Sequence, residues 1–484
     1  MRFLNFITLT LVLLSVTNTW ALPIDWHGTF GVDSTRITDY RRGAEPNTSP
    51  PVGSEVIPSA GGNRNNASFQ SYVFRLNPNI VVNDSASIFG EITTGYGRGG
   101  FMGDGSVNRQ NTSPNTPNRS FGNSLYYYNT SSSDSNLVLN KFYMELYSDA
   151  ATFVIGRQPI NFGLGALFNE GSGTWDRHTS VNDGFSAKLK FSNFKFVPHW
   201  AKINSASGNR TDAANVSDYG IQAMYDNPDK DMVVGIYYGK RKSQTNSNYY
   251  KSGALLQGDT NLKLIDVFFK KGFGKLSTGL EIPLASGNMG HVYNANDKVS
   301  YSAKAVVLET KYEFSEKWTG GLMAGQISGS DGDQSKFGAM YLNPNYQVAN
   351  LLYRYNLYAI ADATQSVWDS YMTNTRYAKL FGKYQNESWV WNAGLLYAQA
   401  EQVAKVGTSF DHERNASFTA TENQKKDLGY ELDAGFDFLW NPNVTLSGNG
   451  GYLFTGDYYK YTNSGTQSKV KNMYVTSLSV AVTF

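Results

Sequence analysis

Few residues of this chain have the types and spacing that catalysis requires. The sequence has five histidines and no cysteine, so thiolate nucleophiles and thiolate metal sites are excluded. The best local cluster runs from Trp175 to Ser180 and places His178 between Asp176 and Thr179. A hydrolytic site needs a histidine within reach of a nucleophile or a carboxylate, but polar mixtures of this kind are common in loops. We therefore expect no enzyme activity and no cofactor.

A second cluster could bind a metal ion. Asp331 and Asp333 lie close together in the segment from Ser328 to Asp333, and closely spaced carboxylates can coordinate calcium. The segment lacks the distal bidentate acid that completes a calcium loop of that kind. A polar surface loop is therefore the expected structure, with no metal site.

Charged residues occupy alternating positions of candidate strands and could line the interior of a pore. Basic residues gather at 183–203 and acidic residues at 427–440. Fixed charges along a pore wall bias the solutes that pass, and opposed basic and acidic walls would create a transverse field at a constriction. The alternative is that these charges pair with one another and brace the wall. The polar residues that alternation assigns to the interior are Arg75, Glu91, Lys141, Glu145, Lys188, Lys190, Lys195, His199, Glu281, Lys379, Lys383, Glu431, Asp433 and Asp437. We expect weak net ion selectivity.

The segment 156–170 follows a candidate strand and is too apolar for a solvated loop, since it contains Leu164, Leu167 and Phe168. One interpretation is a loop that folds into the pore, where Arg157 and Asn161 narrow it. The other is a loop that packs on the rim or at a subunit interface. The sequence leaves both open.

A second apolar and aromatic segment, 342–361, lies inside the longest predicted loop. Exposed hydrophobic patches usually mark interaction surfaces. The segment is therefore compatible with an extra hairpin, with a loop folded into the interior, or with a contact between subunits.

The elements that would position these residues are β-strands with period-2 alternation. In 427–440, Leu432 and Phe436 fall on an apolar face, whereas Glu431, Asp433 and Asp437 fall on the other. If the apolar face meets lipid, a lysine at Leu432 or Phe436 should cost roughly 2–4 kcal/mol near the bilayer midplane. A lysine at Glu431 should then be tolerated.

The connections between candidate strands alternate between short and long. The short ones carry turn residues such as Asn227-Pro228-Asp229 and Asn441-Pro442-Asn443. The long ones include 38–67, 98–135 and 329–369. Transmembrane barrels have short periplasmic turns and longer extracellular loops. The sequence therefore predicts an all-β, transmembrane, antiparallel up-and-down β-barrel of about 18 strands, with about 16 as the main rival.

The first residues read as a signal peptide, with Arg2 before an apolar stretch and a small-x-small site at Thr19-Trp20-Ala21. We expect a signal peptide at 1–21 and an outer-membrane β-barrel at 22–484. The 14% aromatic share and the 47 glycines suit interfacial girdles and curved strands. The formal net charge of +2 gives no reason to expect a nucleic-acid partner.

The chain resembles Gram-negative outer-membrane β-barrel porins. Its final strand alternates and finishes in phenylalanine, which is similar to the assembly signal of such barrels; the residues that carry this pattern are Tyr474, Leu478, Val480, Val482 and Phe484. Gly156-Arg157-Gln158, followed by Phe162-Gly163, resembles a segment of proteobacterial porins. Together with 75–78 and 343–347, it also resembles major porin-like outer-membrane proteins of predatory bacteria.

The resemblance implies a bacterial outer-membrane porin that forms a water-filled channel for passive diffusion of small hydrophilic solutes or ions. Its implied partners are outer-membrane lipid, the barrel-assembly machinery and further copies of itself in a homo-oligomer. The pore-lining residues would be Arg157, Asn161, Lys188, Lys190, Lys195, Glu431, Asp433 and Asp437. The alternative is a structural, porin-like oligomeric barrel whose interior is blocked or holds lipid.

Overall fold

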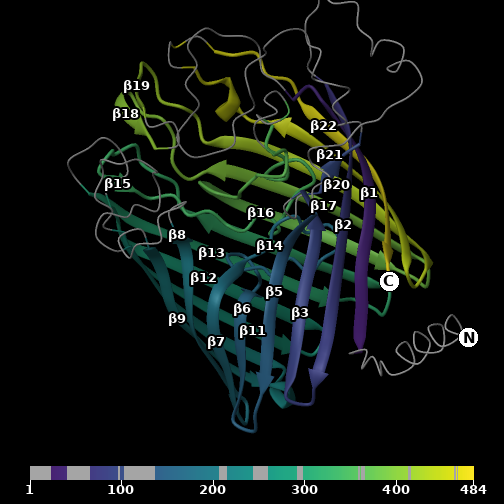
Figure 1. Ribbon diagram of the computed structural model, residues 1–484. Coiled ribbons are helices and arrows are strands. Elements are labelled where there is room, and N and C mark those ends of the chain that lie inside the picture. Colours follow the sequence, from purple (N-terminus) through teal and green to yellow (C-terminus); the bar gives the residue numbers. More distant parts are fainter. Residues whose placement is uncertain are drawn as a thin grey trace, which may run out of the picture.

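The computed structural model describes residues 23–40, 66–95, 99–102, 137–205, 215–243, 260–290, 298–357, 360, 366–412, 416–462, 465 and 467–484. These residues form a closed antiparallel barrel of 18 strands (Figure 1). The predicted all-β barrel is therefore confirmed, with 18 strands and not 16. The expected signal peptide at 1–21 lies outside the described residues.

Neighbouring barrel strands in the sheet are also neighbours in the chain, and β22 closes the ring against β1. The strands are β1 (Ile24–Thr38), β2 (Ala67–Asn83), β3 (Ala86–Thr94), β5 (Leu137–Tyr147), β6 (Ala151–Pro159), β7 (Val181–Phe191), β8 (Phe194–Ser205), β9 (Asn215–Asn227), β10 (Met232–Ser243), β11 (Asn261–Phe273), β12 (Leu276–Gly290), β13 (Val299–Glu313), β14 (Trp318–Ile327), β16 (Thr375–Gln385), β17 (Trp389–Ala400), β20 (Asp427–Asn441), β21 (Val444–Thr455) and β22 (Met473–Thr483).

Four short strands and two 3-10 turns accompany the barrel. β4 (Gly100–Phe101) pairs with β2, and β15 (Lys336–Phe337) pairs with β13. β18 (Gly407–Asp411) and β19 (Ala416–Ala420) form a separate hairpin. The turns are η5 (Pro228–Lys230) and η6 (Asp457–Lys460). In the described part of the chain, no helix has the length and apolar content needed to cross a membrane.

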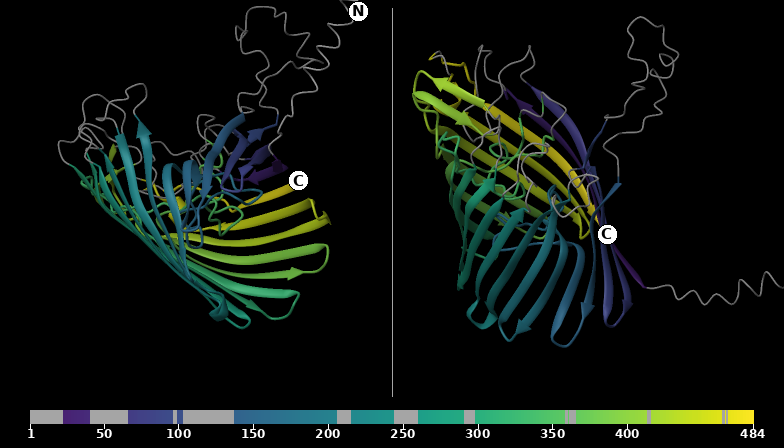
Figure 2. Two further views of the ribbon diagram at one scale, coloured as in Figure 1. Left: turned by 60° about the horizontal axis from the view of Figure 1, so that its bottom comes forward. Right: turned by 60° about the vertical axis from the view of Figure 1, so that its left-hand side comes forward.

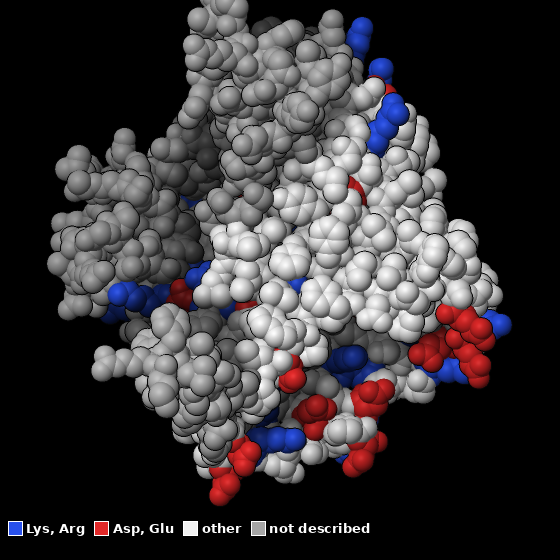
Figure 3. Space-filling model, turned by 45° about the vertical axis from the view of Figure 1, so that its right-hand side comes forward, with Lys and Arg blue, Asp and Glu red and all other residues white. Residues whose placement is uncertain are grey.

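Alternation along each strand separates the two faces of the wall. In β20, Leu432 points outward and is 48% exposed, whereas its neighbour Glu431 points inward and is 0% exposed. Large apolar side chains such as Phe142 and Leu478 are likewise exposed on the outer surface. Figure 3 shows that the middle of this outer wall is almost free of charged side chains, while Lys, Arg, Asp and Glu gather toward its two ends. The predicted face assignment in 427–440 therefore agrees with the structure.

The barrel closes at a seam between its first strand, β1, and its last strand, β22. β1 and β22 pair from Thr29–Thr483 to Thr38–Tyr474. Beyond them, the Gly28 amide donates to the Phe484 carbonyl at 2.8 Å, and the Phe484 amide donates to the Gly28 carbonyl at 3.0 Å. A Cβ atom at residue 28 would lie 2.3 Å from the Phe484 ring and 2.8 Å from the Arg75 carbonyl oxygen. The seam therefore requires glycine at this position.

We expect Gly28→Val to weaken closure of the barrel, because backbone at Arg75 would have to shift to admit the new side chain. Overpacking of this kind costs about 1–3 kcal/mol. Heat-modifiable gel mobility of the refolded protein measures the folded fraction, which should fall. Gly382→Val is the matched control, because nothing lies within 4 Å of a Cβ at that glycine. Equal folded fractions for the two variants would mean that the seam contact does not limit closure.

Two connecting segments lie inside the ring of strands (Figures 1 and 2). The first joins β6 to β7 and is called here the 160–180 loop. The second joins β15 to β16 and is called the 338–374 loop; residues 358–359 and 361–365 within it are not described. Together they supply nearly half of the buried cluster that fills the interior beside β13 to β17.

Candidate functional site

The 160–180 loop first packs against β10 and β11. Phe162 is 2% exposed, and its ring centroid lies 6.0 Å from that of Tyr237 and 6.3 Å from that of Phe268. Phe168 lies on the other side of Tyr237, at 4.8 Å. This apolar contact explains why the segment is so hydrophobic. Of the two interpretations that the sequence left open, the inward fold is the one that the structure shows.

Glu281 on β12 anchors the same part of the loop. Its carboxylate accepts hydrogen bonds from the backbone amides of Leu164, Ala166 (3.4 Å) and Leu167 (3.2 Å). Gly163 precedes them with φ +64°, and a Cβ there would lie 2.3 Å from the carboxylate. The glycine is needed because the backbone must approach Glu281 closely. The Glu281 side chain on the wall thus replaces water as the acceptor for three loop amides.

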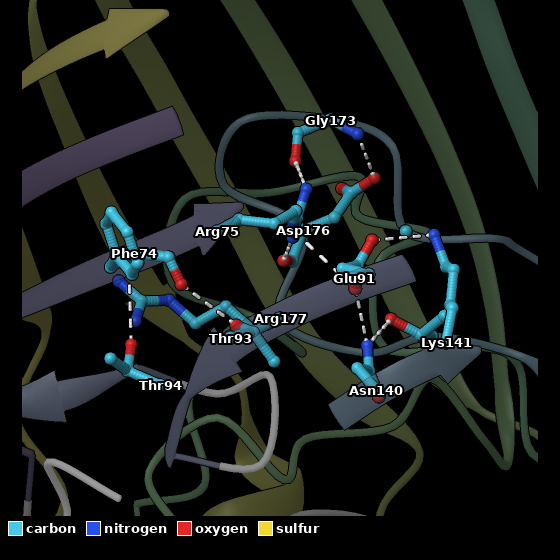
Figure 4. A network of polar contacts seen from close by, with 12 residues as sticks. Phe74, Arg75, Glu91, Thr93, Thr94, Asn140, Lys141, Gly173, Asp176 and Arg177 are labelled. Atoms are coloured by element: carbon cyan, nitrogen blue, oxygen red, sulfur yellow. Dashed lines mark hydrogen bonds and ion pairs between the residues drawn. The ribbon is translucent and has the colours of Figure 1, made fainter. Parts of the chain in front are cut away.

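The middle of the loop is anchored on β2, β3 and β5 (Figure 4). The Arg75 guanidinium donates to the carbonyl oxygens of Gly173 at 3.1 Å and Asp176 at 2.7 Å. Glu91 lies between Arg75, at 3.9 Å, and Lys141, at 2.8 Å. These charges compensate one another and brace the wall, as the second interpretation of the interior charges predicted.

Arg177 ties the end of the loop to β1 and β2. Its guanidinium donates to Asp33 at 2.8 Å and to Ser71 at 2.8 Å, and it lies 3.9 Å above the ring centroid of Trp368. Burial lowers the pKa of Arg177 to about 10, while Asp33 raises it in opposition. Arg177 is therefore protonated at neutral pH, and the ion pair persists there.

Glu431 on β20 anchors the 338–374 loop in a similar way. The backbone amides of Leu351 and Leu352 donate to its two carboxylate oxygens at 2.7 and 2.8 Å. Asp433, two residues along, accepts from the Asn350 amide at 3.2 Å and from Lys379 at 2.9 Å. Both acids are consequently buried under the loop instead of facing water.

The two loops also bind each other. The Asn343 amide donates to the Ala166 carbonyl at 2.8 Å, and the Asn345 side chain donates to the His178 carbonyl at 2.7 Å. The His178 ring nitrogen lies 2.9 Å from the Trp368 carbonyl oxygen. The loops therefore pack against each other inside the barrel, and together they are called here the partition.

A cavity remains between this partition and the wall made by β20, β21, β22 and β1. Its volume is about 100 Å³. Its lining is Asp33, Thr35, Trp175, Arg177, His178, Pro344, Asn345, Gln347, Arg354, Tyr355, Trp368, Asp437, Ser447, Asn449, Ser477 and Ser479. A cavity needs at least about 10–15 Å³ to hold one water molecule, so this one is large enough for several.

Six of the predicted pore-lining residues lie in three inward-facing environments. Asp437 lines the cavity. Lys188, Lys190 and Lys195 share the inner face of the β7–β8 hairpin, where Lys188 pairs with Glu145. That hairpin lies across the barrel from β20, so the basic and acidic groups are on opposed walls. Glu431 and Asp433, however, hold the 338–374 loop.

Arg157 does not point into the interior. It lies on the outer face of β6, the same face as the exposed Phe153 and Ile155, and it forms an ion pair with Asp183 at 3.0 Å. The sequence already held this signal, because residues 153, 155 and 157 share one parity. Asn161 is exposed at the start of the loop, and the cavity lining does not include it.

The residues expected to carry the assembly signal alternate along the last strand. Tyr474, Leu478 and Phe484 are exposed on the outer face, and Val480 and Val482 share their parity. The strand that carries these residues, β22, pairs with β1 on one side and with β21 on the other.

Sequence reasoning missed most of the cavity lining. Arg177 and His178 belong to the 175–180 cluster, whose residue types suggested only a weak catalytic candidate. Ser477 and Ser479 belong to the small, polar face of the last strand. The signal available for this wall was the run of small polar residues at alternate positions of β21 and β22.

No protein-family model and no curated protein sequence matches the chain. Among solved structures, it is similar to OccK8 (OprE) of Pseudomonas aeruginosa, with 11% identity, a TM-score of 0.49, and coverage of 95% of this chain and 98% of that one. The chain is also similar to the outer membrane protein opdK of the same organism, with 10% identity, a TM-score of 0.49, and coverage of 95% of this chain and 99% of that one. A third similar structure is a loop L8 deletion mutant of OmpT, an outer membrane protein of Vibrio cholerae. Its identity is 9% and its TM-score 0.38, with coverage of 96% of this chain and 100% of that one. At such low identity, nothing about the solutes of those proteins transfers to this chain.

Proposed function

We propose that the protein is a channel of the bacterial outer membrane that passes small hydrophilic solutes by passive diffusion. The observation that carries this proposal is the polar cavity between the two inward loops and the β20–β1 wall. It lies inside a closed barrel, and charged, hydroxyl and amide side chains dominate its lining. Such a lining favours water and polar solutes over apolar ones.

The outer surface supports a membrane location. Phe142, Leu432 and Leu478 are exposed there, on strands whose inward neighbours are polar. In water, so much exposed apolar surface would be costly. In a bilayer it meets acyl chains, and a closed barrel leaves no strand edge unpaired in lipid. The barrel-assembly machinery, outer-membrane lipid and a homo-oligomer are the partners that this proposal implies.

The alternative is a structural barrel with a blocked or lipid-holding interior. The small cavity and the two buried loops favour a narrow bore over a wide one. A lipid-holding lumen would need an apolar lining, whereas Asp437, Asn449 and Ser479 are polar. Purified protein in planar bilayers separates these functions. Discrete single-channel steps support the channel, and a membrane that stays silent at saturating protein contradicts it.

We expect Arg354 to influence ion selectivity. It lines the cavity from the loop side, its hydrogen-bond partners in the described structure are Gln347 and Tyr355, and Asp437 lines the opposite wall. Arg354→Glu should therefore shift the zero-current potential in a KCl gradient toward cation preference, because fixed charge acts most strongly at a constriction. Lys190→Glu is the matched control, since it makes the same change on the inner wall outside the cavity. A larger shift of the zero-current potential in the control would indicate that the constriction lies at the β7–β8 wall.

A further inference from the structure

Two adjacent rungs of the wall beside the cavity carry only small polar side chains over β21, β22 and β1. In the first rung, Ser447 pairs with Ser479, which pairs with Asp33. In the second rung, Asn449 pairs with Ser477, which pairs with Thr35. All six residues line the cavity. Because their side chains are short, they form a continuous surface of hydroxyl, amide and carboxylate groups at fixed strand spacing.

On β22 and β1, the surface is bounded by apolar or small residues. The next rung on one side pairs Ala481 with Gly31, and the rung on the other side pairs Val475 with Ile37. Ala481, Val475 and Ile37 are buried. On β22 and β1, these apolar or small residues thus separate the patch at the height of the cavity from the other polar positions of the wall.

An aromatic ring from the 160–180 loop completes one side of the cavity. Trp175 lies against the backbone of β1 at Gly31, where a Cβ would meet the ring at 2.7 Å. The ring remains partly exposed and lines the cavity. Asn345 and Gln347 from the 338–374 loop add amide groups to the same space.

The charged groups around the cavity are largely compensated. Arg177 pairs with Asp33 at 2.8 Å, and the positive charge of Arg354 is matched by the negative charge of Asp437 on the wall. The Asp437 carboxylate accepts from Ser447 at 2.6 Å. A solute with a net charge therefore gains little from this site, whereas a solute with several hydroxyl groups finds both donors and acceptors.

We propose that this patch binds small, uncharged, polyhydroxylated solutes of monosaccharide size. The inference rests on the proposed channel function and names its solute class. Sugar hydroxyls donate to Asp437 and to the serine oxygens, and they accept from the Asn449 amide. The apolar C–H face of the sugar ring packs on Trp175. A cavity with room for several waters suits one sugar ring, whose hydroxyls replace the hydrogen bonds of the displaced waters.

The test uses the purified full-length protein in planar bilayers, with glucose, gluconate and glycine added at matched concentrations. Glucose binding blocks ion flow, so glucose should reduce the ion current in a saturable manner. Gluconate should have an at least about tenfold weaker effect because its net charge meets a compensated site, and glycine should have one because it carries no hydroxyl groups. Asn449→Leu with Ser477→Val should weaken the glucose effect at least about tenfold, because a site built for hydroxyl groups discriminates strongly once its partners are lost. Trp175→Ala should weaken it less.

The matched control is Ser34→Ala with Thr476→Val. These residues lie on β1 and β22, next to the patch residues in sequence, but on the outer face. The control should retain the glucose effect of the unmodified protein. A silent bilayer would contradict the proposed channel function itself. A conducting protein whose current falls with gluconate or glycine but not with glucose would overturn only the solute class, and so would equal loss of the glucose effect in control and patch variants.

Discussion

Replacing Glu281 and Arg177 with alanine in the same chain is expected to raise the single-channel conductance several-fold. These two residues fix opposite ends of the 160–180 loop, at β12 and at β1–β2. Without Glu281, three loop amides lose their acceptor; without Arg177, the loop loses its ion pair with Asp33. Hydrogen bonds to charged groups contribute about 1.5–3 kcal/mol each, so the closed loop should lose most of its advantage over an open one. Each single variant should show a smaller increase.

Glu145→Ala is the control for this prediction. Glu145 is also an inward-facing acid of the wall, but its ion-pair partner is Lys188 on β7 and not a loop amide. Its removal should leave the conductance nearly unchanged. Conductance in the double variant equal to that of the unmodified protein, with the barrel still folded, would show that the loop does not set the narrowest section.

Leu432→Lys is expected to destabilise the barrel in lipid by roughly 2–4 kcal/mol if the residue lies near the bilayer midplane. Leu432 is 48% exposed on the outer face, so the new charge would lose its water to acyl chains. Reversible unfolding in lipid vesicles with denaturant measures the loss. Asn392→Lys is the control, because Asn392 is exposed on the inner face of β17. Equal losses for the two variants would mean that the proposed membrane-facing surface is wrong.

The tolerance expected of Glu431→Lys from the sequence must be corrected. Glu431 is 0% exposed and accepts the amides of Leu351 and Leu352. A lysine there would leave both amides without an acceptor and bury a second cation beside Lys379. Alternation identified the correct face of the strand, but it could not show that a loop from elsewhere in the chain covers that position.

The sequence by itself determined the barrel and the two faces of its wall. Period-2 alternation is a local property, since each strand places successive side chains on opposite faces whatever its neighbours are. The short turns between consecutive strands determined the strand order, because a short turn is also a local feature of the chain. Leu432 and Glu431 could therefore be assigned to opposite faces from their positions in the strand alone. The parity of Phe153, Ile155 and Arg157 contained the outward position of Arg157 as well, although its place beside an apolar loop suggested otherwise.

Only the tertiary structure decided how the interior is filled. The 160–180 loop reaches Glu281 and Asp33, and the 338–374 loop reaches Glu431, through contacts between residues about 80 to 140 positions apart. Such contacts depend on closure of the ring, which places β12 and β20 at fixed positions around it. They decide that Glu431 and Asp433 hold a loop while Asp437, four residues beyond Asp433, faces the cavity. Residue type could not distinguish these three acids, because all three are carboxylates on the same face of one strand. Their roles differ because a loop from elsewhere in the chain covers two of them.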